Sequence, residues 1–296
     1  MNLNILSSHK TQEPESSVLY IVGTPIGNLS DLSFRALNIF RNVSLIACED
    51  TRLTKKIMNK FKFKNNLISF NKNNSQIKIP RIINDLNSGK SIALVSDAGM
   101  PSICDPGEDL VKEARSNGIT IVCIPGPCAV TTALVSSGLP SSKFIFEGFL
   151  PKKKSEREKL LLEISKNDKT TILFESPIRL KNLLNELKDH CGGEREIIVL
   201  RELTKKFEEH IGNHIDQVIK HFESKEVKGE ITIVIKGINK IKKNDKFNEF
   251  ELKEELQYLI KAGLSLSAAS KYLAKKNNLK KRIIYDMYTN KINKIL

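Results

Sequence analysis

The sequence contains no apolar stretch long enough to cross a lipid bilayer. Its longest apolar runs, such as "ITIVIKG" and "TTILFES", fall far short of the roughly 20 residues that a spanning helix needs. Residues 1–17 also contain no apolar segment of signal-peptide length, and we expect them to form a disordered extension. These absences predict a protein that stays in the cytoplasm.

The sequence also has no CxxC pair, the spacing typical of zinc sites and of thiol exchange. Single cysteines predict a reducing compartment and buried, apolar-like thiols. His210 and His214 in "HIGNH" have the spacing of two metal ligands on one helical face, but no cysteine pair accompanies them. We therefore expect no metal site. The cysteines are Cys48, Cys104, Cys123, Cys128 and Cys191.

Negative charge is scarce relative to positive charge. The chain carries 48 Lys and Arg against 34 Asp and Glu, a formal net charge of +14. Residues 237–296 alone hold 14 Lys and Arg against six Asp and Glu. Such an excess favours a polyanionic partner, although a general richness in Lys, Asn and Ile explains part of it.

Apolar runs that are typical of strands alternate with amphipathic helical patterns over the first half of the chain. This rhythm predicts a parallel sheet covered by helices on both faces. In "CDPGEDLVKEA" we expect Asp105 to cap a helix, with Pro106 at its first position and Glu108 closing a capping box. The predicted strands lie within residues 18–25, 45–50, 67–71, 92–97 and 120–126.

The rhythm changes after residues 137–142, where some strands are joined by short connections. We expect a second α/β domain with a mixed sheet and one clear helix. The predicted strands lie within residues 143–151, 170–176, 196–203 and 229–237, and the helix carries Leu180, Leu183, Leu184 and Leu187.

Beyond Gly237 a charged linker precedes a helical region with the outline of a helix-turn-helix. We predict an extension over residues 1–17, α/β domains over 18–137 and 138–238, and a helical domain over 245–296. The residues expected to face inward on its three helices are Leu252, Leu256 and Leu259, then Ala269, Tyr272 and Leu273, then Leu279, Ile283 and Met287.

Three predicted strand ends in the first half are rich in Gly and Pro: "GTPIGN" (23–28), "SDAGMPSICDPG" (96–107) and "PGPCA" (125–129). Ligands of open α/β sheets bind outside the carboxyl ends of the strands, so we expect a ligand cleft there. "GTPIGN" is not followed by the Lys and Ser or Thr of a P-loop. Pro25 also stands where a dinucleotide fingerprint has its middle Gly. A pyrophosphate ligand is therefore disfavoured.

Seven ordered motifs resemble the tetrapyrrole-methylase superfamily of S-adenosylmethionine-dependent methyltransferases, from Val18 to the C-terminus. Two of them, "EDTR" and "EGFLP", point to its RNA-modifying branch, and Met100 departs from the small polar residue expected there. The motifs are "TPIGNLSDLSFRAL", "ACEDTRLTKK", "VSDAGMPSICDPG", "IPGPCAVTTAL", "FEGFLPKK", "FESPIRL" and "LRELTKKFEE".

The resemblance implies two α/β domains with S-adenosylmethionine in the cleft between them, and a homodimer. Asp97 is expected at the ribose or amino-acid end of the cofactor. The remaining cofactor contacts that it implies are Thr24, Pro25, Ile26, Gly27, Ala98, Gly99, Gly126, Pro127 and Ala129.

The resemblance also implies methyl transfer to the 2′-hydroxyl of a cytidine in the decoding region of 16S rRNA. Glu49, Asp50 and Arg52 are candidates for acceptor binding and proton removal, unless Glu49 and Arg52 form a structural ion pair. A tetrapyrrole-type small-molecule methyltransferase and a non-catalytic RNA-binding assembly factor remain as alternatives. The basic residues expected to contact RNA phosphates are Lys152, Lys153, Lys154, Arg179, Lys271, Lys275, Lys281 and Arg282.

Overall fold

The computed structural model describes residues 13–238, 249–277 and 279–292. Contacts divide the chain into one compact unit up to Ile238 and a second from Asn239 onward. At the start of the described residues, Glu13 forms an ion pair with Arg35, with 2.5 Å between Oε1 and Nη2. This end of the predicted extension is therefore held against the first helix.

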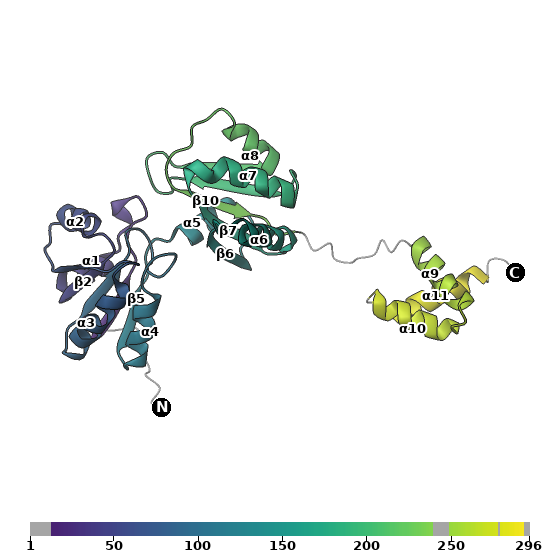
Figure 1. Ribbon diagram of the computed structural model, residues 1–296, viewed down its shortest axis with the longest axis horizontal. Coiled ribbons are helices and arrows are strands. Elements are labelled where there is room, and N and C mark those ends of the chain that lie inside the picture. The colour runs from purple at the N-terminus through teal and green to yellow at the C-terminus, as the bar shows by residue number, and fades with distance from the viewer. Residues whose placement is uncertain (1–12, 239–248, 278, 293–296) are drawn as a thin grey trace. The chain divides into compact units, whose positions relative to one another are not determined.

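The first sheet contains five parallel strands in the order β3-β2-β4-β1-β5, which confirms the predicted parallel sheet (Figure 1). A short 3-10 helix, η1 (Leu29–Asp31), and four α-helices connect them. The strands are β1 (Val18–Val22), β2 (Leu45–Cys48), β3 (Leu67–Ser69), β4 (Ile92–Val95) and β5 (Thr120–Ile124). The helices are α1 (Phe34–Asn42), α2 (Thr51–Lys60), α3 (Ser75–Asn87) and α4 (Glu108–Ser116).

Both faces of this sheet are buried, because alternate residues of each strand point to opposite sides. In β1, Leu19 packs in a cluster with Ile82 of α3 and Leu110 of α4, whereas Tyr20 packs in another with Phe40 of α1. All five side chains are at most 1% exposed. Helices cover both faces of the sheet, and this explains why β1 is apolar along its whole length.

The second sheet is mixed, as predicted, with the order β6-β7-β10-β8-β9. Strand β6 runs parallel to β7, whereas β10 is antiparallel to both of its neighbours, β7 and β8. Its strands are β6 (Phe144–Phe149), β7 (Thr170–Glu175), β8 (Glu196–Arg201), β9 (Glu209–His214) and β10 (Ile231–Ile235). Its helices are α6 (Lys154–Lys166), α7 (Pro177–Cys191) and α8 (Ile215–Phe222), and all four predicted leucines of α7 are buried.

Helix α5 (Ala129–Ser137) follows the last strand of the first sheet but packs against the second. Its Val130, Ala133 and Leu134 share a buried cluster with residues of β7, β8 and β10. The helix ends at Gly138, whose φ of +69° is the left-handed conformation common at helix ends. Helix α5 therefore holds the carboxyl edge of the first sheet next to the second.

The "HIGNH" segment is strand β9 rather than a helix. It pairs antiparallel with β8 at the edge of the second sheet. His210 Nε2 lies 2.8 Å from Glu208 Oε1, and His214 Nδ1 lies 2.9 Å from the Glu194 carbonyl oxygen. Each histidine therefore has a local partner. Within the described ranges, no group of three or more His, Cys, Asp or Glu could hold a metal ion.

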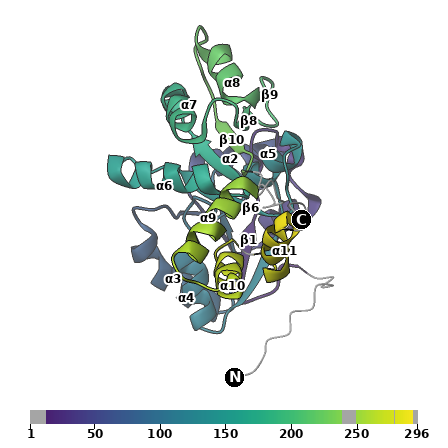
Figure 2. The ribbon, with the colours of Figure 1, turned by 90° about the vertical axis from the view of Figure 1, so that its right-hand side faces the viewer.

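The second unit contains helices α9 (Glu249–Lys261), α10 (Leu266–Lys276) and α11 (Lys281–Ile292), drawn in yellow-green to yellow in Figure 2. Leu256, Leu273 and Ile284 are at most 1% exposed and form its core. The predicted inward positions of Tyr272 and Ile283 are wrong, because these side chains are 54% and 40% exposed. Asn278, in the predicted turn, lies outside the described residues. None of the helices described for this chain is long and apolar enough to span a membrane.

Candidate functional site

The three Gly- and Pro-rich turns lie together because they follow adjacent strands. Strands β4, β1 and β5 are neighbours and parallel, so their carboxyl ends share one edge of the first sheet. Two backbone hydrogen bonds join the first turn to the second. Thr24 N donates to Gly99 O at 2.9 Å, and Gly99 N donates to Thr24 O at 3.1 Å.

Glycine is required where these turns approach one another. A Cβ atom on Gly126 would lie 2.8 Å from the Cα atom of Gly23, closer than real Cβ contacts. Gly99 has a φ of +84°, a conformation that side chains disfavour, and a Cβ there would lie 3.3 Å from Ile26 Cγ2. Glycine at these positions therefore lets the backbones of the turns pack against one another.

A cavity of about 420 Å³ opens at this edge, within the roughly 300–1,000 Å³ typical of small-molecule sites. The first sheet supplies its turns, and the second sheet supplies the ends of β6 and β7 and the start of β10. The antiparallel β10 makes this possible, because its first residue, Ile231, pairs with Glu175 at the end of β7. The lining residues from the first sheet and α5 are Ile26, Ala98, Gly99, Met100, Ile103, Cys104, Asp105, Cys128, Ala129 and Val130. Those from the second sheet are Phe149, Phe174, Glu175, Ser176, Pro177, Leu203, Gly229, Glu230, Ile231 and Thr232.

Four of the predicted cofactor residues line this cavity, namely Ile26, Ala98, Gly99 and Ala129. Two further predicted residues, Thr24 and Asp97, do not line the cavity but form hydrogen bonds at the turns. Thr24 Oγ1 donates to the Ser96 carbonyl oxygen at 3.2 Å, and Asp97 Oδ1 accepts from the Asp50 amide at 2.8 Å. The lining does not include Thr24, Pro25, Gly27, Asp97, Gly126 or Pro127.

The "EDTR" residues lie beside the cavity but do not line it. Asp50 caps α2 by accepting from the Arg52 amide, and it also forms an ion pair with the Arg52 side chain, 2.6 Å between Oδ2 and Nη2. Hydrogen bonds from Arg52 lower the pKa of Asp50 to about 2. The expected alternative, an ion pair of Arg52 with Glu49, is replaced by this pair with Asp50.

Glu49 lies among other carboxylates at the carboxyl edge of the first sheet. Burial raises its pKa, and the neighbouring charges of Asp105 and Asp97 raise it further. Burial likewise raises the pKa of Asp97. This group of acids gives the edge of the cavity a negative character, which suits a cationic ligand.

The predicted helix cap at Asp105 is wrong, because α4 begins at Glu108 and its N-cap is Gly107. Asp105 instead lines the cavity, as do its neighbours Ile103 and Cys104. The segment "CDPGE" pointed to Asp105, but it also matched the common capping pattern, so the sequence predicted a helix cap and not a lining residue. Of the five cysteines, which are all free, only Cys48 is buried, so the expectation of buried thiols is wrong for the others.

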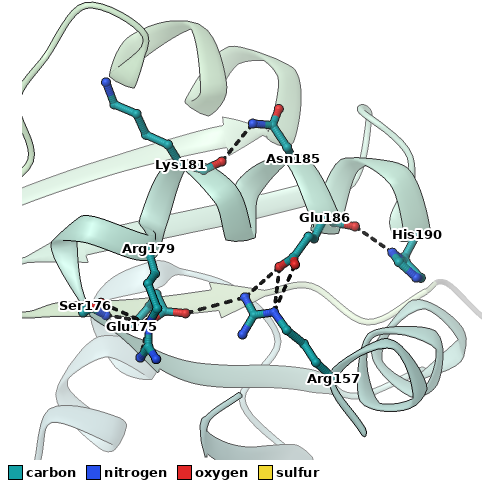
Figure 3. Close-up of polar contacts among 8 residues, drawn as sticks. All are labelled: Arg157, Glu175, Ser176, Arg179, Lys181, Asn185, Glu186 and His190. Atoms are coloured by element: carbon teal, nitrogen blue, oxygen red, sulfur yellow. Dashed lines mark hydrogen bonds and ion pairs between the residues drawn. The ribbon is translucent and has the colours of Figure 1, made fainter. Parts of the chain in front are cut away.

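Glu175, at the end of β7, is held by two arginines (Figure 3). Its side chain has no exposed area, and its Oε1 lies 2.6 Å from Arg179 Nη2. Arg157 lies 3.8 Å from Oε2 and pairs with Glu186 at 2.6 Å. Arg179, predicted to contact RNA, thus has a buried partner, and its spacing of four residues in "ESPIR" could have predicted this pair.

The other predicted RNA contacts lie on exposed surface. Lys152, Lys153 and Lys154 follow β6 at the start of α6, close in sequence to the lining residue Phe149. Lys271, Lys275, Lys281 and Arg282 are exposed on α10 and α11 of the second unit. The geometry is compatible with phosphate contacts, which stay a prediction.

The lining fits a nucleoside that carries an amino-acid arm. Phe149 and Phe174 lie with ring centroids 5.7 Å apart, and together with Ile26 and Leu203 they offer apolar surface to a base. The turns offer backbone groups, and the acids offer negative charge for a sulfonium and an ammonium group. The cavity therefore fits S-adenosylmethionine by size and by chemistry.

Comparisons with known proteins agree with this fit. Residues 18–219 match the model of the family Tetrapyrrole (Corrin/Porphyrin) Methylases. The chain is similar to proteins named Ribosomal RNA small subunit methyltransferase I from two bacteria. It is 48% identical to that of Thermotoga maritima over 219 residues, which are 74% of this chain and 98% of the relative. It is 40% identical to that of Bacillus subtilis over 277 residues, 93% of this chain and 94% of the relative.

Solved structures share the fold at low sequence identity. A cobalt precorrin-4 methyltransferase matches 74% of this chain and 95% of its own, with a TM-score of 0.57 and 15% identity. A uroporphyrin-III C-methyltransferase from Thermus thermophilus, complexed with S-adenosylhomocysteine, matches 73% of this chain and 96% of its own, with a TM-score of 0.52 and 12% identity. The sequence relatives and the fold together confirm the resemblance. The chain therefore belongs to the ribosomal RNA small subunit methyltransferase I family, a branch of the S-adenosylmethionine-dependent tetrapyrrole methylases.

Proposed function

We propose that the protein methylates the 2′-hydroxyl of a cytidine in the decoding region of 16S rRNA. The observation that carries this proposal is the cavity between the two sheets, in a chain 40–48% identical to relatives named for small-subunit rRNA. The tetrapyrrole enzymes with the same fold are only 12–15% identical in the two comparisons above, so they support the fold and not the substrate.

Bound S-adenosylmethionine supplies an activated methyl group on a sulfonium. The task of the protein is then to place the acceptor hydroxyl in line and to exclude water. Ile26, Gly99 and Ala129 border the cavity on one side, and Phe174 and Thr232 border it on the other. The carboxylates at its edge can accept a proton from a ribose hydroxyl, which is a weak acid.

Two basic surfaces support an RNA substrate. Lys152, Lys153 and Lys154 lie in the same unit as the cavity, and the side chains of Lys153 and Lys154 are 71% and 90% exposed. In the second unit, the basic side chains gather on α10 and at the start of α11, whereas α9 carries Glu254 and Glu255. This distribution directs positive charge to one part of the helical unit.

A homodimer is part of the proposal. Phe34 and Ile178 are each 93% exposed and Val135 is 74% exposed, so these apolar side chains are available to an interface. Sedimentation of the full chain should give twice the monomer mass. The monomer mass at micromolar concentration would remove this part of the proposal.

Ribose-methylation mapping of 16S rRNA, from cells with and without the gene, tests the function. We expect one cytidine in the decoding region to lose its 2′-O-methyl group when the gene is removed. Methylation of a uroporphyrinogen-type substrate by the purified protein, with the rRNA unchanged, would favour the small-molecule alternative. Failure to bind S-adenosylmethionine would favour a non-catalytic assembly factor.

A further inference from the structure

Three carboxylates line the cavity, and they differ in their partners. Glu175 is buried and held by Arg179 at 2.6 Å. Glu230 is largely exposed, and its Oε2 lies 3.2 Å from Lys205 Nζ. Asp105 forms no ion pair within the part of the chain that the structure describes. It is therefore the lining carboxylate whose lone pairs are most available to a substrate.

The acids just outside the cavity are engaged elsewhere. Asp50 is tied to Arg52, which lowers its pKa to about 2 and makes it a weak base. Asp97 accepts a hydrogen bond from the Asp50 amide, and Glu49 accepts one from the Asp97 backbone. These contacts stabilise the ends of β2 and β4. Unlike Asp105, none of these three acids lines the cavity.

The backbone around Asp105 adopts an uncommon conformation. Ser102 and Cys104 have positive φ values of 69° and 66°, a conformation that residues other than glycine rarely adopt. The Lys72 ammonium group donates to the Cys104 carbonyl oxygen at 2.9 Å and holds the loop in place. Gly148 makes room for the loop, because a Cβ there would lie 2.9 Å from Cys104 Sγ. The fold thus maintains a strained loop that places Asp105 at the cavity.

We infer that Asp105 is the proton acceptor for the substrate hydroxyl in the proposed methyl transfer. As the oxygen forms its bond to the methyl carbon, the carbon–sulfur bond breaks and its electron pair neutralises the sulfonium. The hydroxyl proton passes to the Asp105 carboxylate and then to solvent. This assignment rests on the proposed function, since it requires a hydroxyl as the acceptor.

The charged and polar groups around Asp105 suit this role. Burial raises the pKa of Asp105, and the charge of Asp97 adds to this rise. A hydrogen bond with Ser96 and the positive charge of Lys72 oppose it. Glu49 adds a further negative charge nearby. A carboxylate of raised pKa is a stronger base than an ordinary aspartate.

The test is Asp105→Asn, compared with Asp109→Asn as a matched control on α4. Asp109→Asn removes the same charge four residues away, and Asp109 does not line the cavity. Single-turnover methylation of the small subunit should fall about 100-fold or more in Asp105→Asn, the scale of a lost general base. The control should keep the wild-type rate. Calorimetric affinity for S-adenosylhomocysteine and affinity for rRNA should stay within twofold in both variants.

A second readout does not depend on activity. Because the folded pKa of Asp105 is raised, its ionised form destabilises the protein above that pKa, and the penalty disappears as the pH falls below the unfolded value. Asp105→Asn should therefore have a higher Tm than the wild type at pH 7, and the difference should shrink towards pH 4.

Two results would overturn the inference. A variant that methylates at the wild-type rate removes Asp105 from proton transfer. A variant that loses S-adenosylhomocysteine affinity in proportion to its rate makes Asp105 a cofactor ligand instead. The proposed function fails separately, if wild-type protein places no methyl group on a ribose of the small subunit.

Discussion

The two sheets of the first unit contribute to the cavity in different ways. The first sheet presents turns in which Gly23 and Gly126 let the backbones pack against each other and Gly99 lines the cavity. The second sheet presents side chains, among them Phe149, Phe174 and Glu175. A surface built from backbone groups tolerates most side-chain substitutions, whereas a surface built from side chains changes with each of them. The two sides of the cavity should therefore respond differently to mutation.

The largest effect should come from the second sheet, where Glu175→Ala leaves Arg179 without its buried partner. We expect a loss of about 3 kcal/mol in the free energy of unfolding, because the buried Glu175 carboxylate no longer accepts hydrogen bonds from the Ser176 amide and the Arg179 side chain. Denaturant unfolding measures it. Glu156→Ala is the matched control, since Glu156 pairs with Lys153 on the surface, where their side chains are 58% and 71% exposed, and its loss should be clearly smaller. Equal losses in the free energy of unfolding would mean that the burial of Glu175 does not increase its contribution to stability.

The next effect should come from the turns of the first sheet. Gly99→Val places a side chain against Ile26 at the cavity, and overpacking of roughly 1–3 kcal/mol corresponds to a five- to hundredfold loss of affinity. Calorimetry with S-adenosylhomocysteine measures it. Gly89→Val is the control, because Gly89 also has a positive φ of 95° but has no atoms within 4 Å of a Cβ. Both variants should lose stability because of the positive φ, and only Gly99→Val should lose affinity. Unchanged affinity would exclude this turn from the site.

The helical unit belongs to neither sheet, and deletion of residues 245–296 separates its role from theirs. We expect severalfold weaker RNA binding and a flatter salt dependence, because fewer counterions are released. Cofactor affinity should not change. The Thermotoga maritima relative supports the feasibility, since 219 residues of this chain already match 98% of it. Sedimentation must show the same oligomeric state. If the truncated chain binds RNA with the same salt dependence as the full chain, the helical unit does not contact RNA. The RNA surface would then have to lie around Lys152, Lys153 and Lys154.

The smallest effect concerns the cap of α2 at the edge of the first sheet. The pKa of Asp50 is lowered from 3.8 to about 2, so its stabilising contribution is present above about pH 4 and is lost as the pH falls through 2. Asp50→Asn should lower the Tm slightly at pH 7 and not at pH 2. Thermal melts at both pH values measure this. A difference that persists at pH 2 would mean that the cap acts without its charge.

The edge of the first sheet could be predicted from the sequence because one rule connects the turns. Parallel strands bring their carboxyl ends to one side, so turns after β1, β4 and β5 had to meet once these strands were identified. These turns contain Ile26, Ala98, Gly99 and Ala129, which the resemblance to the methylases implied as cofactor contacts and which line the cavity. Neither the strand pattern nor the resemblance could distinguish residues that face the cavity from residues that support it, such as Thr24 and Asp97, because that depends on side-chain direction.

The second sheet's contribution could not be predicted in the same way. Its order depends on β10, which is last in sequence and lies between β7 and β8. Strand β9 carries mostly exposed residues and lacks the apolar alternation by which edge strands are identified. Asp105 was missed because the loop before it bends through positive φ values at residues whose types do not favour them. Tertiary contacts, such as the hydrogen bond from Lys72 to the Cys104 carbonyl oxygen, determine such conformations.

The position of β10 also determines when the protein can become active during its synthesis. The first sheet is complete once Ile124 has left the ribosome, because all five of its strands precede that residue. The second sheet lacks its central strand until Ile235 emerges, and until then β7 and β8 have no partner between them. Chains generally fold from the N-terminus as they are made. A nascent chain therefore carries the completed first sheet for more than 100 residues of synthesis before the second sheet, which forms the other side of the cavity, can be completed.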